Sequence, residues 1–231
     1  AFVSVMSVGE PFDLDSRDDN VENVDMHSKE KDSEEFIHNI DWRMFCGKPV
    51  VSDLFASLGA FIEYLKQSPT LRTTFCNRNR LIKKRLEEMS QQLLQLIKIC
   101  GDILNIDLSL DVSDLDTKIS SEQKLFLRRL IAKSFPFQIA EKVSITFQLN
   151  DPNRKLASKL PTYRVLGASP NDSLRFLHPS SLLSKIPPKF LVFTESLSVN
   201  DRKTSAVRHY IKNVTAIEPN WIPSQTLAKA I

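Results

Sequence analysis

Residues 143–149 read VSITFQL, and in this stretch Val143, Ile145, Phe147 and Leu149 alternate with polar residues. An apolar period of two is typical of a strand with one buried face. Turn-forming residues follow directly at 151–153 (DPN). The stretch therefore marks the point at which the chain changes from helical to strand-like patterning.

Four more strand-like segments follow, at 162–166, 173–178, 189–195 and 207–217. Prolines and an Asn-Asp pair separate them. Five short strands, with 17 lysines and arginines against 7 acidic residues beyond residue 121, favour a small basic Greek-key barrel. An OB-fold is the leading interpretation because it combines five strands with a nucleic-acid surface, and other small barrels are the alternatives.

Before residue 143 the apolar period is helical. A stripe with spacings of four, three and four residues predicts a first helix that Ser52 or Asp53 caps and that Pro69 ends. Gly59 inside this helix indicates close packing against a neighbour. The stripe itself comprises Leu54, Leu58, Phe61 and Leu65.

A second helix is predicted from about Asn79 to Ile103. Its apolar stripe comprises Leu86, Met89, Leu93, Leu96 and Cys100. Its first turns carry five basic residues, Arg78, Arg80, Lys83, Lys84 and Arg85. Basic residues at a helix start oppose the helix dipole, so either an anion lies nearby or these residues form an exposed face.

A third helix is predicted to open at Ser120, where Ser120 and Gln123 have the spacing of a capping box. The first twelve residues are apolar and are expected to be either a strand or the last turns of a buried helix. The fold class expected is therefore α+β, a helical module followed by a five-stranded barrel.

The charge of the chain is unevenly distributed although its net value is only +3. Residues 13–35 hold ten acidic side chains against three basic ones. We expect 13–40 to be an acidic, flexible insert, either simply solvated or able to cover a basic groove.

The sequence lacks the motifs of several site classes. It contains no GxxxxGK[ST] loop, no nucleophile elbow, no HExxH motif and no cluster of paired carboxylates, so no catalytic residue is expected. Cys46, Cys76 and Cys100 lie too far apart for a zinc site, and we expect buried, reduced thiols and no metal. No apolar run is long enough to span a bilayer, so no membrane partner is expected.

Three stretches in order resemble the C-terminal region of DEAH-box RNA helicases. They are LHPSSLL at 177–183, PPKFLVFTES at 187–196 and YIKNVTAIEPNWIP at 210–223. Upstream, FVSVMSVGEPF (2–12) and SSEQKLFLRRLIAKSF (120–135) are also similar to that family. The start of the chain, the acidic insert and the Trp-Ile-Pro ending are most similar to the nucleolar branch that acts in small-ribosomal-subunit assembly.

The sequence also departs from the family pattern. Ser90, Gln91 and Gln92 stand where the family helix usually carries arginines, and the positive charge lies earlier, at 78–85. An insertion also lengthens the barrel hairpin at 198–203.

The resemblance implies four segments. Residues 1–12 would end a preceding winged-helix or helical segment, 13–40 would be the acidic insert, 41–118 a helicase-associated helical module, and 119–231 a helix followed by an OB-fold.

The resemblance also implies a function that this chain cannot perform alone. ATP and magnesium would bind in RecA-like motor domains, which the chain lacks, and no cofactor is expected in the chain itself. The expected partners are single-stranded or structured RNA of pre-ribosomal origin, a protein activator that docks on the OB-fold, and the RecA-like domains, in the nucleus and nucleolus. The alternative is a protein-interaction scaffold of a ribonucleoprotein with little RNA affinity of its own.

Residues with hydroxyl, imidazole or cationic side chains in the barrel half are the candidate RNA contacts, since these groups suit phosphate oxygens and bases. They are Arg175, His178, Ser180, Ser181, Lys203, Arg208 and Lys212. For His178 and the two serines a structural role remains the alternative, in which they cap the strand end and order the following turn.

Overall fold

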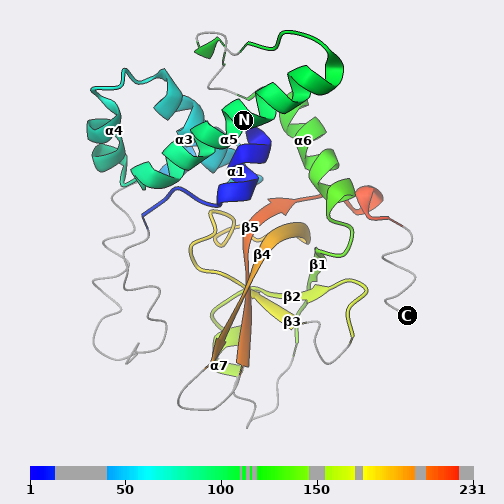
Figure 1. The fold of residues 1–231 in the computed structure, drawn as a ribbon. Helices are drawn as coiled ribbons and strands as arrows, with labels where there is room; N and C mark the ends of the chain where they lie inside the picture. Colours follow the sequence, from blue (N-terminus) through cyan, green and yellow to red (C-terminus); the bar gives the residue numbers. More distant parts are fainter. Residues whose placement is uncertain are drawn as a thin grey trace. The chain divides into compact units, whose positions relative to one another are not determined.

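A computed structural model describes residues 1–13, 41–109, 111–112, 115, 119–145, 154–169, 174–200 and 207–223. Most of the acidic insert, from residue 14 to 40, and Lys203 lie outside these ranges. The chain folds into two compact units (Figure 1). The described parts of 1–49 and 54–119 form the helical unit, and residues 50–53 together with the described parts of 120–231 form the barrel unit.

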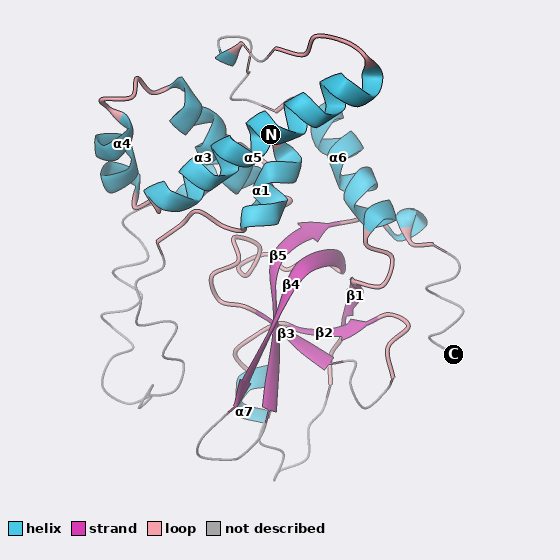
Figure 2. Ribbon diagram, viewed as in Figure 1, coloured by secondary structure: helices cyan, strands magenta, loops and turns pink. Residues whose placement is uncertain are grey.

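The helical unit is built from short and long helices (Figure 2). They are α1 (Phe2–Val8), the 3-10 helix η2 (Trp42–Phe45), α3 (Asp53–Lys66), α4 (Arg72–Asn79) and α5 (Lys83–Leu104). The start of the chain is thus helical, and α1 packs against α5 with Val5 fully buried. At the start of η2, the Asp41 carboxylate accepts a hydrogen bond from the Arg43 backbone N–H.

The predicted stripe of α3 is the core of this unit. Leu54, Leu58 and Phe61 are buried, and the helix ends at Lys66, before Pro69. Gly59 has the packing role that its position indicated, because a Cβ there would lie 1.9 Å from the Phe45 carbonyl oxygen. The backbone of η2 can approach α3 this closely only where the helix lacks a side chain.

The predicted second helix starts later than expected, because its first predicted residue, Asn79, belongs to a separate helix, α4. Arg80 has φ 50° and ends α4 in the left-handed conformation, and α5 begins only at Lys83. Leu86, Met89 and Leu93 are buried as expected. Cys46 and Cys76 are also buried, but Cys100 is exposed, so the expectation of three buried thiols was wrong for that residue.

Among its described residues, the barrel unit contains five strands in the order β1-β2-β3-β5-β4, closed into a barrel. β3 and β5 run parallel and the other pairs are antiparallel. The strands are β1 (Ile139–Lys142), β2 (Thr162–Val165), β3 (Leu174–Leu177), β4 (Phe190–Asn200) and β5 (Val207–Ala216). A closed five-stranded barrel with non-sequential pairing of the last strands is the Greek-key arrangement of the OB-fold, and the expected α+β class is confirmed.

Fully buried side chains fill the barrel, among them Tyr163, Leu177, Leu191 and Ile211. Burying each aliphatic chain of this size contributes about 1.5–3 kcal/mol. Residues 50–53 complete the unit: the Ala216 N–H donates to the Val51 carbonyl at 2.8 Å, and Ser52 forms a bridge with Thr215.

The first strand lies earlier than its prediction. The alternation at 143–149 indicated a strand there, whereas β1 is Ile139–Lys142, with Ile139 and Ala140 fully buried. The Val143 N–H still donates to the Thr162 carbonyl at 2.9 Å, so pairing with β2 continues one residue beyond β1. Residues 146–149 lie outside the described ranges.

Two helices and a 3-10 turn complete the barrel unit: α6 (Ser121–Ser134), α7 (Arg154–Ala157) and η5 (Pro219–Trp221). α6 opens with the predicted capping box, in which Ser120 Oγ accepts from the Gln123 N–H and the Gln123 amide oxygen accepts from the Ser120 N–H. Arg128 of α6 donates to the Ala216 carbonyl at 2.7 Å and lies over the Trp221 ring. In the described part of the chain, no helix has both the length and the apolar character needed to cross a membrane.

Candidate nucleic-acid interface

The outer face of β2, β3 and β5 combines basic and apolar side chains. Leu177 and Ile211 point into the barrel core. Because successive side chains of a strand point to opposite faces, the residues next to them in sequence point outward. Register places Arg164 opposite Leu174 and Phe176 opposite Tyr210. Arg208 lies two residues before Tyr210, on the same face.

Three of the predicted RNA contacts lie on this face. His178 continues the line of Phe176, and its N–H donates to the Ile211 carbonyl at 3.0 Å. Lys212 continues the line of Arg208 and Tyr210 along β5. The structure therefore brings His178, Arg208 and Lys212 together on one outer surface, which we call the β5 face.

Arg175 does not share the β5 face. Successive residues of a strand point to opposite faces, so Arg175 is on the same face of β3 as Leu177 and not on that of Phe176. Its guanidinium donates to the Leu174 carbonyl at 2.9 Å. Lys203, the seventh candidate, lies outside the described residues. Its role and that of Arg175 stay predictions.

Two rings in line with the residues of the β5 face are almost fully buried. Phe176 and Tyr210 are each only 4% exposed, and their centroids lie 6.2 Å apart. The His178 ring meets the Tyr210 ring edge-on at 5.8 Å. Because both larger rings are buried, their contribution is to packing and to holding the imidazole of His178.

The turn that follows β3 is ordered by its own side chains. His178 Nδ1 accepts from the Ser180 N–H at 3.2 Å and lies 2.7 Å from Ser180 Oγ. In the neutral ring this geometry places the imidazole proton on Nε2, which suits donation to a phosphate oxygen. The structural interpretation of Ser180 and the RNA-binding one are therefore compatible.

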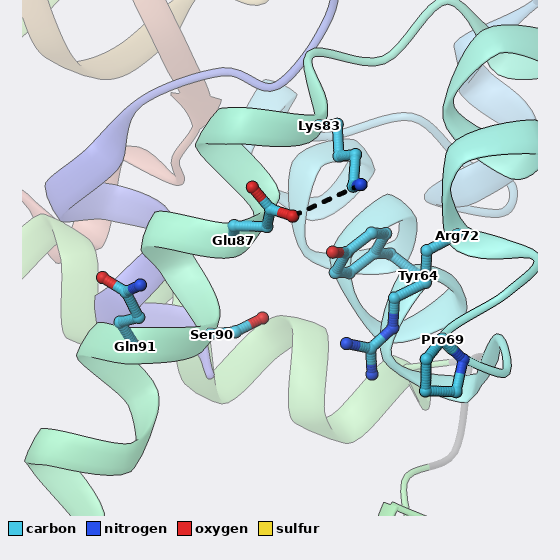
Figure 3. Close-up of a pocket in the computed structure, with 7 residues that line it drawn as sticks. All are labelled: Tyr64, Pro69, Arg72, Lys83, Glu87, Ser90 and Gln91. Carbon is cyan, nitrogen blue, oxygen red and sulfur yellow. Dashed lines mark ion pairs between the residues drawn. The ribbon is translucent and has the colours of Figure 1, made fainter.

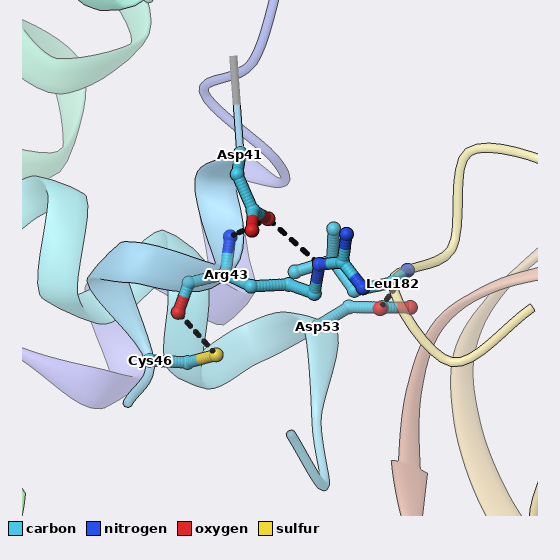
Figure 4. A network of polar contacts seen from close by, with 5 residues as sticks. All are labelled: Asp41, Arg43, Cys46, Asp53 and Leu182. Carbon is cyan, nitrogen blue, oxygen red and sulfur yellow. Dashed lines mark hydrogen bonds and ion pairs between the residues drawn. The ribbon is translucent and has the colours of Figure 1, made fainter. Parts of the chain in front are cut away.

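Ser181 has mainly internal contacts. Its side chain is buried, and its hydroxyl donates to Asp53 Oδ1 at 3.2 Å. The same carboxylate accepts from the Leu182 N–H at 2.9 Å, as Figure 4 shows, and from the Val214 N–H at 3.0 Å. Asp53 therefore links the turn after β3 to β5, and Ser181 contributes to this link.

Arg164 is a basic residue of the outer face that was missed at the sequence level. It is exposed between Tyr163 and Val165, both of which are buried. The alternation in TYRVL already placed its side chain outward, and β2 with β3 is the face on which OB-folds bind oligonucleotides. Arg164 lies far in sequence from the basic residues of β5, so the sequence did not indicate that they share a face.

Tyr163 anchors the opposite, inner side of β2. Its hydroxyl donates to the Pro188 carbonyl at 2.7 Å. Burial raises the pKa of this hydroxyl far above its ordinary value, so it is neutral under all physiological conditions. Across the described residues, His, Cys, Asp and Glu side chains form no group of three that could hold a metal.

Two comparisons with known proteins agree with this geometry. The family described as Oligonucleotide/oligosaccharide-binding (OB)-fold matches residues 127–225. A human protein named "Probable ATP-dependent RNA helicase DHX37" is 27% identical over 176 residues. That match covers 75% of this chain but 13% of the relative, so the chain spans about an eighth of the relative's length. Residues 127–225 thus form an OB-fold domain, and about three quarters of the chain resembles the C-terminal region of a DEAH-box RNA helicase.

Proposed function

We propose that this chain is the RNA- and cofactor-binding C-terminal portion of an ATP-dependent DEAH-box RNA helicase that acts in pre-ribosomal RNA processing and small-subunit assembly, in the nucleolus. The observation that carries the proposal is the β5 face, where His178, Arg208 and Lys212 lie over buried aromatic rings on an OB-fold barrel.

Each group on this face has a separate task. Arg208 and Lys212 bind successive phosphates, Arg164 extends the positive surface onto β2, and His178 donates to a phosphate or stacks on a base. Such contacts hold a single strand without selecting its sequence. Selection of a pre-ribosomal target is the task of other parts of the protein and of its partners.

ATP hydrolysis belongs to the rest of the enzyme. In the proposed full-length protein, RecA-like domains bind ATP and magnesium, and the barrel guides RNA to them and receives a protein activator. The assignment to ribosome assembly is supported by the likeness of the first twelve residues and of the Trp-Ile-Pro ending (221–223) to the nucleolar branch of the family.

Replacing both cations of β5 tests the RNA surface. We expect Arg208→Ala together with Lys212→Ala to weaken binding of a fluorescent single-stranded RNA about tenfold or more at 0.1 M salt, because two phosphate contacts are lost. Fluorescence anisotropy measures the affinity, and circular dichroism shows whether the barrel stays folded.

Two exposed lysines on helices, which are not part of the β5 face, provide the matched control. Lys98→Ala with Lys133→Ala removes the same charge and should change the affinity less than twofold. If both double variants bind RNA as tightly as the unmodified chain, the β5 face is not the RNA surface.

Exposed apolar residues on α6 favour the alternative function of a protein-docking scaffold. Phe126 is 66% exposed and Leu130 is 46% exposed on this helix. A scaffold would bind a protein partner at salt concentrations that abolish RNA binding. Phe126→Asp would then break partner binding and leave RNA affinity unchanged.

A further inference from the structure

The helical unit contains a polar pocket of about 370 Å³, far in sequence from the β5 face. Figure 3 shows it between the end of α3, the start of α4 and the first turns of α5. Its lining residues are Tyr64, Pro69, Arg72, Lys83, Glu87, Ser90 and Gln91. The volume lies at the small end of the range for small-molecule sites.

One wall of the pocket consists of hydrogen-bond donors. The Arg72 guanidinium lies 5.0 Å from the centre of the Tyr64 ring, and its buried Nε has no acceptor within the described residues. Lys83 Nζ donates to Thr73 Oγ1 at 3.1 Å, which leaves further ammonium protons for a ligand.

Tyr64 adds a neutral donor to the same wall. Burial raises the pKa of its hydroxyl, although the neighbouring Arg72 opposes the shift, so the hydroxyl keeps its proton at neutral pH. Arg72, which lies over the Tyr64 ring, carries only donors and therefore cannot accept the phenolic proton.

The other wall presents acceptors. Ser90 Oγ donates to the Leu86 carbonyl at 2.9 Å, so its lone pairs face outward from α5. The Glu87 carboxylate lies 3.6 Å from Lys83, which holds it at the rim. A ligand that satisfies both walls has an anionic end toward Arg72, Tyr64 and Lys83 and a hydroxyl-bearing end toward Ser90 and Glu87.

We propose that this pocket binds a ribose-phosphate unit, with the phosphate on Arg72 and Lys83 and the sugar hydroxyls on Glu87 and Ser90. Two cations against one carboxylate give the site a positive balance that suits a single phosphate. The chemistry is the same for a free nucleotide and for one residue of an RNA strand. Because the pocket belongs to the helical unit, this proposal holds whether or not the β5 face binds RNA.

Titration of the whole chain with ribose 5-phosphate, followed by NMR, tests the proposal. We expect saturable binding, with shifts at residues around the pocket, and weaker binding of 2-deoxyribose 5-phosphate and of inorganic phosphate. Equal binding of all three compounds, or shifts confined to other residues, would overturn it.

Variants separate a specific site from surface charge. Lys83→Met and Arg72→Gln should each weaken ribose 5-phosphate binding about tenfold, whereas Lys84→Met, which changes the adjacent lysine outside the lining, should have less than a twofold effect. Because Arg72 also packs on Tyr64, Tyr64→Phe and Ser90→Ala serve as variants that keep the packing, and each should weaken binding about threefold or more. Equal losses in Lys83→Met and Lys84→Met would refute the site.

Two ligands distinguish the sources of the ribose phosphate. Adenosine 5′-monophosphate carries a doubly charged terminal phosphate, whereas an RNA trinucleotide without terminal phosphates carries only diesters. Competition by the monophosphate alone would assign the pocket to free nucleotides, and competition by the trinucleotide would assign it to an RNA strand. Failure of both to displace ribose 5-phosphate would overturn the proposal.

Discussion

Asp53 joins three segments of the barrel unit through one carboxylate. It accepts from the Ser181 hydroxyl and from the N–H groups of Leu182 and Val214. Both backbone donors depend on it, and the side chain is almost fully buried. Hydrogen bonds to a charged acceptor stabilise more than neutral ones, and a buried donor left without an acceptor adds a further cost.

We therefore expect Asp53→Ala to lower the free energy of unfolding of the barrel unit by about 2–4 kcal/mol. Urea denaturation followed by Trp221 fluorescence measures the loss. Asp41→Ala, which removes an exposed carboxylate paired with Arg43 nearby in sequence, should change it by less than about 0.5 kcal/mol. Similar values for the two variants would contradict the linking role of Asp53.

Tyr163 gives the barrel a dependence on alkaline pH. The pKa of its hydroxyl is raised in the folded state by burial, whereas the unfolded chain releases this proton near pH 10. The tyrosine contribution is therefore fully present below pH 10 and is lost as pH rises above that value, because only the unfolded state then gains by ionising.

Melting temperatures measured between pH 9 and 11.5 should fall more steeply for the unmodified chain than for Tyr163→Phe. The variant should also be about 1 kcal/mol less stable at pH 7, since the hydrogen bond to Pro188 is lost. Parallel pH profiles would show that the Tyr163 hydroxyl does not control alkaline stability.

At this scale the sequence reveals which way a side chain faces but not what it meets. The alternation in TYRVL (162–166) contains enough information to place Arg164 outward, although the residue was missed. Ser181 was expected to contact RNA or to order the local turn. Its hydroxyl does order the turn, because it accepts from the Leu183 N–H at 3.2 Å, and it also bonds Asp53, 128 residues away. No local pattern encodes a partner at that distance.

The helix α6 shows what local pattern predicts well. Its capping box at Ser120 and Gln123 depends on four consecutive residues, and both reciprocal hydrogen bonds are present. The apolar stripe of α3 is equally local, and its ends agree with the structure.

Loss of the cap should destabilise α6. We expect Ser120→Ala to reduce the free energy of unfolding by about 1 kcal/mol, because the N–H of Gln123 loses its acceptor. Ser121→Ala, one residue later and exposed, should have an effect below about 0.3 kcal/mol. Thermal denaturation of the two variants compares their stability. Equal losses of stability would show that the capping box does not stabilise the helix.

Elements with a weaker local pattern were misplaced. α4 (RTTFCNRN) buries only Cys76, so it has no apolar stripe to reveal it, and it was partly merged with α5. β1 buries Ile139 and Ala140 within the closed barrel, ahead of the alternation that begins at Val143. Tertiary packing, which the sequence pattern does not contain, determined both boundaries.

For the whole molecule, the candidate RNA surface predicts a specific dependence on salt. If Arg164, Arg208 and Lys212 each neutralise one phosphate, replacing all three with Ala should reduce the slope of log K against log salt concentration by about 2. Anisotropy titrations from 50 to 300 mM salt measure both slopes. An unchanged slope would mean that other cations carry the binding.

The pairing of β5 also sets the order in which the barrel can be completed. β5 lies between β3 and β4, so a nascent chain that has emerged only through β4 has unpaired edges on both of those strands. Open edges recruit other strands and favour aggregation. Barrel closure must wait until residues 207–216 have left the ribosome, and a chain interrupted before that point would need a chaperone to remain monomeric.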